Sequence, residues 1–137
     1  MHIANSSLFR ADLYAVAFNY RTENMSIEFV NSPSQWGTER GIKISGTPIA
    51  CALLDHETDQ WTVLIQNEIS EAEAKSVIDK LEIFGGVGTE VDSIRKPKDF
   101  LIHLLLHEIA HLKHKWGQDM EQDCDRWAFE QAAKIAA

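Results

Sequence analysis

The sequence predicts one α+β domain in which a small antiparallel sheet of three or four strands packs beside a pair of helices. Three observations predict this fold class. The chain has 137 residues, of which 45% are hydrophobic, so it can build one core but is short for two domains. The apolar spacing changes from helical to alternating and back to helical. Two consecutive helical patterns then close the sequence, and we expect residues 1–137 to form a single domain.

The N-terminal half predicts one helix followed by strands. Leu8 and Leu13 lie at helical spacing within residues 7–20, which indicates an amphipathic helix. Residues 25–30 alternate between apolar and polar side chains, as a half-buried strand does. Residues 31–37 contain proline and glycine and are predicted to form a loop.

Three further extended segments complete the predicted sheet. Residues 41–45 alternate with a period of two, and residues 48–54 are mainly apolar. Residues 55–60 are polar and predict a turn, so residues 61–66 should pair with the preceding segment as an antiparallel hairpin.

A second helix is predicted from Ser70 to about Leu81. Ser70 and Glu73 have the spacing of a capping box, and the segment is polar enough to lie outside the core. Residues 85–88 include three glycines, but no phosphate-binding fingerprint surrounds them. We expect a flexible connector there.

A third helix is predicted at residues 100–116. Asp99 is a candidate N-cap, Pro97 lies just upstream, and Gly117 occupies the position expected of a C′ residue. Apolar residues recur at helical spacing around most of its circumference, which indicates a buried helix.

This helix contains the pattern His-Glu-x-x-His at His107, Glu108 and His111. A spacing of four residues places both imidazoles on one helix face, where they can bind one metal ion. The neighbouring carboxylate of Glu108 can take a proton from water, so the pattern is typical of zinc hydrolases. The alternative is a histidine-rich core helix that matches the pattern by chance.

A catalytic zinc ion usually has three protein ligands, so a third donor is needed. Residues 118–136 predict a further helix with Glu121 and Asp125 on one face. We expect Glu121 to bind the metal and Asp125 to accept a hydrogen bond from a ligand histidine. An exposed acidic face is the simpler alternative.

Three other residues compete as the third ligand. His103 and His114 are on the same helix as the first pair, and three donors along one helix would spread over two turns or more. Asp123 falls two residues after Glu121, on a different face of the helix predicted at residues 118–136. For His103, a buried hydrogen-bonded histidine is the simpler interpretation.

The two patterns together resemble the ImmA/IrrE family of zinc metallopeptidases. The resemblance rests on His107-Glu-Ile-Ala-His111, a short connection, and Glu121-x-x-x-Asp125-Arg-Trp-Ala-Phe, and it covers roughly residues 97–131. The family's usual Leu-Met-Pro after the acidic helix is absent.

The resemblance implies a minimal zincin-like domain with Zn²⁺ as its cofactor. His107, His111 and Glu121 would be the metal ligands, Glu108 the catalytic base and Asp125 a supporting carboxylate. The implied activity is hydrolysis of a peptide bond in a specific protein partner, such as the repressor of a mobile element or of a stress regulon. The alternatives are a catalytically silent zinc protein that captures a regulatory partner, and a domain without a metal.

Composition bounds the partners and the location. The formal net charge of −8 disfavours direct binding to nucleic acid or to an anionic membrane surface. No signal peptide or membrane-spanning stretch is evident, so we expect a cytoplasmic protein. Cys51 and Cys124 lack the spacing of paired ligands and are expected to be reduced, buried thiols.

Overall fold

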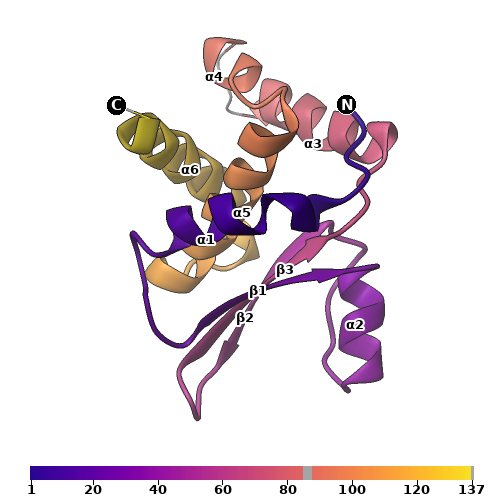
Figure 1. Cartoon of the computed structure of the whole chain (residues 1–137), viewed down its shortest axis with the longest axis vertical. Helices are drawn as coiled ribbons and strands as arrows, with labels where there is room; N and C mark the ends of the chain where they lie inside the picture. Colours follow the sequence, from indigo (N-terminus) through magenta and orange to yellow (C-terminus); the bar gives the residue numbers. More distant parts are fainter. Residues whose placement is uncertain (85–87, 137) are drawn as a thin grey trace.

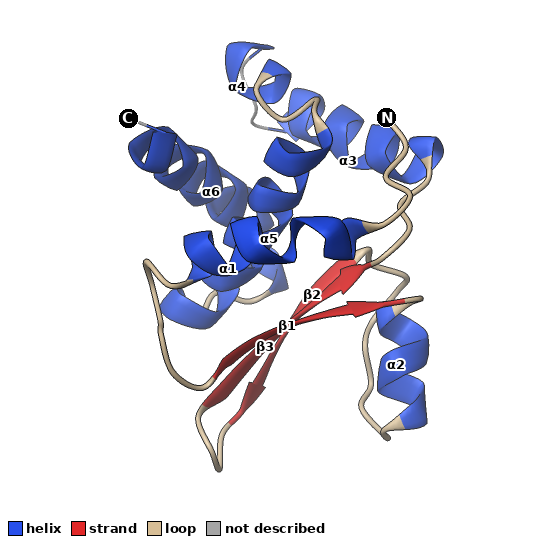
Figure 2. Cartoon of the chain, viewed as in Figure 1, coloured by secondary structure: helices blue, strands red, loops and turns tan. Residues whose placement is uncertain are grey.

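The computed structural model describes residues 1–84 and 88–136 and has an α+β fold (Figure 1, Figure 2). Helices from both ends of the chain gather on one side of a small sheet, and α2 lies on the other side. In chain order the elements are η1 (Ser6–Phe9), α1 (Arg10–Ala17), β1 (Met25–Val30), α2 (Pro33–Glu39), β2 (Ala50–Asp55), β3 (Gln60–Gln66), α3 (Glu71–Phe84), α4 (Gly88–Asp92), α5 (Pro97–His114), η2 (Gln118–Met120) and α6 (Glu121–Ala136).

The sheet is mixed and has the strand order β1-β3-β2. β2 and β3 form the predicted antiparallel hairpin, with Ala50 opposite Ile65. β1 instead runs parallel to β3, with Met25 opposite Trp61, so the prediction of an antiparallel sheet is wrong for this strand. The physical reason is that α2 and β2 separate β1 from β3, and this long connection returns the chain to the sheet in the same direction.

The segment between β1 and β2 contains a helix where a loop was predicted and a loop where a strand was predicted. Ser32 caps α2 by accepting a hydrogen bond from the Gln35 amide, and Pro33 occupies the first turn. Residues 41–45 form no strand. They pack back against α2, where the Ile42 amide bonds to the Gly37 carbonyl. A Cβ atom on Gly37 would lie 2.6 Å from the Ile42 carbonyl oxygen, so this close approach requires glycine.

Helix α3 begins with the predicted capping box. The Glu73 amide donates to Ser70 Oγ, and the Ser70 amide donates to the Glu73 carboxylate. The prediction that this helix lies outside the core is wrong, because Ala74, Ile78 and Leu81 form a buried stripe along one face. The glycine connector predicted at residues 85–88 falls mostly on residues 85–87, which lie outside the described residues.

Helix α5 is the centre of the fold. It contacts β2 and β3 on one side and α1 and α6 on others, as Figure 1 shows. Its largest fully buried apolar side chains are Phe100, Leu101, Leu105, Leu106 and Ile109. Burial of each contributes about 1.5–3 kcal/mol to folding, which fixes the axis and rotation of the helix. Among the described residues, no helix combines the length and apolarity needed to cross a membrane.

The ends of α5 differ from the prediction. The helix begins at Pro97 rather than at Phe100, because proline is favourable in the first turn and Lys96 has the extended conformation of an N-cap. It ends at His114. Lys115, rather than Gly117, takes the left-handed conformation, with φ of 56°. The chain therefore reverses two residues earlier than a C′ position at Gly117 would imply, and this turns the Trp116 carbonyl back toward the helix.

Candidate metal centre

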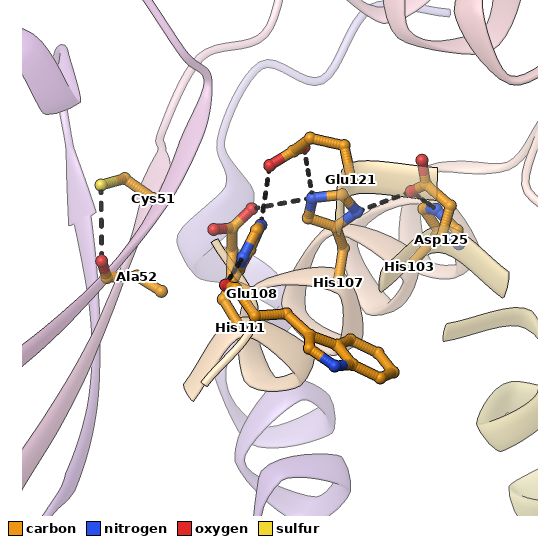
Figure 3. A network of polar contacts seen from close by, with 9 residues as sticks. Cys51, Ala52, His103, His107, Glu108, His111, Glu121 and Asp125 are labelled. Carbon is orange, nitrogen blue, oxygen red and sulfur yellow. Dashed lines mark hydrogen bonds and ion pairs between the residues drawn. The ribbon is translucent and has the colours of Figure 1, made fainter. Parts of the chain in front are cut away.

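Helix α5 carries the His-Glu-x-x-His residues on its partly covered side, and α6 faces them. His107 and Glu108 are each 9% exposed. The two ligand-candidate rings, those of His107 and His111, have centroids 5.1 Å apart. Such buried polar side chains are costly unless they are paired, and α6 supplies the partners. Figure 3 shows the Glu121 side chain extending over both imidazoles.

The carboxylate of Glu121 bridges the two histidines. Its Oε2 atom lies 2.9 Å from His107 Nε2, and its Oε1 atom lies 2.8 Å from His111 Nε2. The structure therefore brings His107, His111 and Glu121 together, with both Nε2 atoms facing the same carboxylate. Residues from two helices meet there, as the sequence analysis expected for a site of this kind.

The other nitrogen of each imidazole is held by a fixed acceptor. His107 Nδ1 lies 2.6 Å from Asp125 Oδ1, and His111 Nδ1 lies 2.6 Å from the Trp116 carbonyl oxygen. Both acceptors require a proton on Nδ1, which leaves the Nε2 lone pair of a neutral imidazole free for a metal ion. The contact of the Trp116 carbonyl with His111 was not predicted from the sequence. Its role depends on the left-handed Lys115, for which the sequence carries no glycine signal.

His103 adds a third imidazole to the same network. It lies one turn before His107, is 2% exposed, and places Nε2 2.9 Å from Asp125 Oδ1. As expected from the sequence, it is a buried, hydrogen-bonded residue. His114 is exposed and stacks on Trp116 with ring centroids 4.3 Å apart. Asp123 is also exposed.

Charge pairing determines the protonation of the metal-free site. Burial alone would lower the pKa of His107, but hydrogen bonds with Asp125 and Glu121 outweigh burial and raise it to about 10. Burial alone would raise the pKa of Glu121, but hydrogen bonds from His107 and His111 lower it to about 2. The pKa of His111 is raised, chiefly by its hydrogen bond with Glu121. Protons on the imidazoles thus balance the carboxylates, and a divalent cation can replace them.

Glu108 lies on the side of the histidines that faces β2 (Figure 3). Its Oε2 atom is 3.9 Å from His107 Nε2, so it lies beside the converging ligand atoms without joining them. Burial raises the pKa of Glu108, while the charges of His107 and His111 act in the opposite direction. A carboxylate with a raised pKa is a stronger base than an exposed one, which suits proton transfer near neutral pH.

The donor set fits zinc. Two imidazole nitrogens and one carboxylate oxygen are a frequent catalytic set that leaves a fourth position open. Two ligand atoms on one tetrahedral zinc ion lie ~3.3 Å apart, given bonds of ~2.0–2.1 Å. The Nε2-to-oxygen separations of 2.9 and 2.8 Å are shorter than this by ~0.5 Å. A small outward movement of Glu121, whose side chain is 52% exposed, accommodates the difference.

Two further donor groups lie close by. Potential ligand atoms of His107, His111 and Cys124 are within 4.8 Å of one another, and so are those of His103, His107 and Asp125. Cys124 was expected only as a reduced, buried thiol, because it lacks the spacing of paired ligands. Burial, followed by the charge of Glu121, raises its pKa to about 12, so the thiol is protonated. We favour Glu121 as the third donor because each of its oxygens already lies close to the Nε2 atom of one of the two histidines, at 2.9 and 2.8 Å.

The sequence offers Tyr14, Tyr20, His56 and His103 as donors to a developing oxyanion, without a reason to choose among them. The Tyr14 hydroxyl bonds to the backbone of β1, and the Tyr20 hydroxyl donates to Gln131. His103 bonds to Asp125. His56 lines the cleft described next but is exposed.

Two adjoining hollows flank the centre and form one cleft between α5 and the β2 segment. The first has a volume of about 450 Å³ and an apolar wall of Ile49, Val77, Leu81 and Leu104. The second, of about 880 Å³, is lined by residues 50–54 of the chain and by Trp116. Both include Glu108 and Glu121, so the metal centre lies where they meet.

Both cysteines are free thiols, but only Cys124 is fully buried. Cys51 is half-buried in β2 and lines the second hollow. Burial raises its pKa to about 11, so it too is a protonated thiol.

Comparison with known proteins gave no further guide to this centre. No protein-family model, curated protein or solved structure matches the chain.

Proposed function

We propose that the chain is a zinc-dependent metalloendopeptidase, of the ImmA/IrrE kind that its motifs resemble, and that it hydrolyses a peptide bond in a specific protein partner. One observation carries the proposal. His107 and His111 each form a hydrogen bond from Nδ1 to a fixed acceptor, and both direct Nε2 to the same carboxylate. A histidine-rich core helix that matches the motif by chance has no reason to arrange both rings in this way.

His107, His111 and Glu121 would hold the zinc ion. When bound, zinc would activate a water molecule and polarise the carbonyl group of the substrate. Glu108 is placed to accept a proton from that water and to pass it to the leaving amine. Asp125 and the Trp116 carbonyl keep the two imidazoles in the orientation and tautomer that the ligand set requires.

The cleft supports an extended polypeptide as the substrate. β2 is an outer strand of the sheet, and its residues line the cleft beside Glu108. An extended chain can add to an outer strand through backbone hydrogen bonds, which hold a peptide without regard to most of its sequence. The apolar wall of the first hollow would then accept an apolar side chain next to the cleaved bond.

A comparison of Glu108→Gln with the zinc-loaded parent tests the proposed activity. Both proteins are incubated with a soluble extract of the source cells, and new peptide N-termini are identified by mass spectrometry. We expect a few parent-specific cleavages, lost by about 10²–10⁴-fold in Glu108→Gln, because the neutral amide cannot accept the proton. Glu73→Gln is the matched control, since it makes the same chemical change on α3 and should cleave like the parent.

The outcomes separate the proposed enzyme from its rivals. Equal cleavage by Glu108→Gln and the parent would reject Glu108 as the base. Zinc binding without any cleavage, together with specific retention of one partner by both proteins, would favour the silent capture protein. A parent that binds no zinc would reject the metal centre altogether.

A further inference from the structure

The network around Asp125 contains a residue that the zinc chemistry does not use. His103 and His107 both direct a ring nitrogen to the same atom, Asp125 Oδ1, at 2.9 and 2.6 Å (Figure 3). The ring of His103 is also packed on Phe129 of α6, with centroids 4.5 Å apart. His103 therefore joins the helix of the ligand histidines to the helix of the supporting carboxylate.

The contacts determine the protonation of His103. A carboxylate oxygen can only accept, so His103 Nε2 must carry a proton, as must His107 Nδ1. His103 Nδ1 is buried and has no hydrogen-bond partner among the described residues. A proton there would be an unsatisfied buried donor, which is costly. The contacts therefore assign the donated hydrogen bond of His103 to Nε2.

We propose that His103 is a positioning residue for the metal centre, and this inference rests on the proposed zinc site. Its N–H holds Asp125 Oδ1 in place from the buried side of α5. Asp125 then holds the N–H of His107 and leaves His107 Nε2 directed at the metal position. His103 acts through Asp125 and is not a metal ligand, although its side chain contributes to the lining of the first hollow.

A second role for His103 competes with this one. A metal ion could be held by His103, His107 and Asp125 together, because their donor atoms lie within 4.8 Å of one another. That arrangement would engage His107 through Nδ1 and would remove the hydrogen bond that orients its Nε2. The two roles predict opposite states for the His107 Nδ1–H proton in the zinc-loaded protein, which is present in a positioning network and absent in a ligand set.

The test uses the full chain, zinc and three variants. His103→Phe keeps a ring against Phe129 but removes the donor, and His103→Gln retains an N–H donor. Phe129→Leu is the matched control, since it loosens the packing of the same ring and leaves both hydrogen bonds. Zinc affinity is measured by competition with a chelator, and the His107 Nδ1–H proton is observed by NMR in the zinc-loaded protein. His103→Met replaces His103→Phe if that variant fails to fold.

We expect His103→Phe to weaken zinc binding by ~10-fold, the lower end of the effect of losing an outer partner of a metal ligand. Its His107 Nδ1–H proton should exchange with water faster than in the parent. His103→Gln should restore much of the affinity, and Phe129→Leu should change stability but not zinc affinity. In an Asp125→Ala background His103→Phe should have no further effect, because the two changes act through one pathway.

Three results would overturn the inference. The first is a zinc affinity of His103→Phe equal to that of the parent. The second is an equal loss of zinc affinity on His103→Phe in the parent and in the Asp125→Ala background. The third is absence of the His107 Nδ1–H proton from the zinc-loaded parent. Failure of the proposed peptidase activity would leave the inference standing, since neither readout involves cleavage. If the parent bound no zinc, the inference and the proposed function would both be wrong.

Discussion

Helices α3 and α5 differ in where their polar side chains lie. Helix α3 exposes most of its charges and begins with a reciprocal cap, and Lys75 pairs with Asp79 one turn later at the surface. Helix α5 has no side-chain cap and buries His103, His107 and Glu108. The first pattern stabilises a helix locally. The second costs stability unless partners from elsewhere compensate, which is the expected mark of a functional site.

The largest effect on zinc binding is expected when the partner that α6 supplies to the histidines of α5 is removed. Glu121→Ala should weaken zinc binding by about 10²-fold or more, because it deletes a proposed ligand rather than an outer partner. Chelator should lower the melting temperature of the parent and leave that of Glu121→Ala nearly unchanged. Calorimetric titration of the metal-free protein with zinc, followed by thermal melting, measures both.

Cys124→Ser is the control for this change, because Cys124 is the other donor on α6 near both histidines. We expect it to bind zinc like the parent. The cobalt-substituted parent should also lack thiolate-to-metal absorption. Normal zinc affinity in Glu121→Ala, together with a large loss of zinc affinity in Cys124→Ser, would identify the thiol as the third ligand. That result would contradict the family resemblance.

The same contrast explains how much of the molecule could be predicted. The His-Glu-x-x-His spacing and the Ser70 capping box act over three or four residues, and the structure has both in helices. The hairpin of β2 and β3 is likewise joined by a short turn. These features follow from local geometry, which a sequence records directly.

Most of the failures involve distant partners or backbone conformation. The parallel pairing of β1 with β3 depends on a connection through two other elements, and the alternation of residues 41–45 reflects packing on α2 rather than a strand partner. The Trp116 carbonyl reaches His111 because Lys115 adopts a left-handed conformation without glycine. A pattern of side chains carries no record of such contacts.

A moderate effect should follow from removing the local stabiliser of α3. Ser70→Ala loses the acceptor for the Glu73 amide, 3.1 Å away, and should lower the free energy of unfolding by about 1 kcal/mol. Zinc affinity should not change, because the cap stabilises the helix without touching the centre. Urea unfolding with and without chelator measures the effect, and Ser32→Ala at the cap of α2 is the matched control. A loss of zinc affinity in Ser70→Ala would show that α3 and the metal centre are coupled.

The smallest expected effect concerns the pKa values of one carboxylate from each helix, Glu73 of α3 and Glu108 of α5. Hydrogen bonds from the Ser70 amide and then from the Gln66 side chain lower the pKa of Glu73, whereas burial raises that of Glu108. Because the folded-state pKa of Glu73 lies below its unfolded value, its contribution to stability is complete above the unfolded pKa and is lost as the pH falls through the folded one.

Carboxylate NMR titration of the metal-free protein should therefore give Glu73 a pKa below its ordinary value and Glu108 a pKa above it. Gln66→Ala removes the donor that lies 2.8 Å from Glu73 Oε2, so it should move the pKa of Glu73 part of the way back and leave Glu108 unchanged. The accompanying change in stability should be only a few tenths of a kcal/mol, because solvent screens a partly exposed carboxylate. If both carboxylates titrated together in the normal range, the contrast between a locally stabilised helix and a helix built around a site would lose its electrostatic basis.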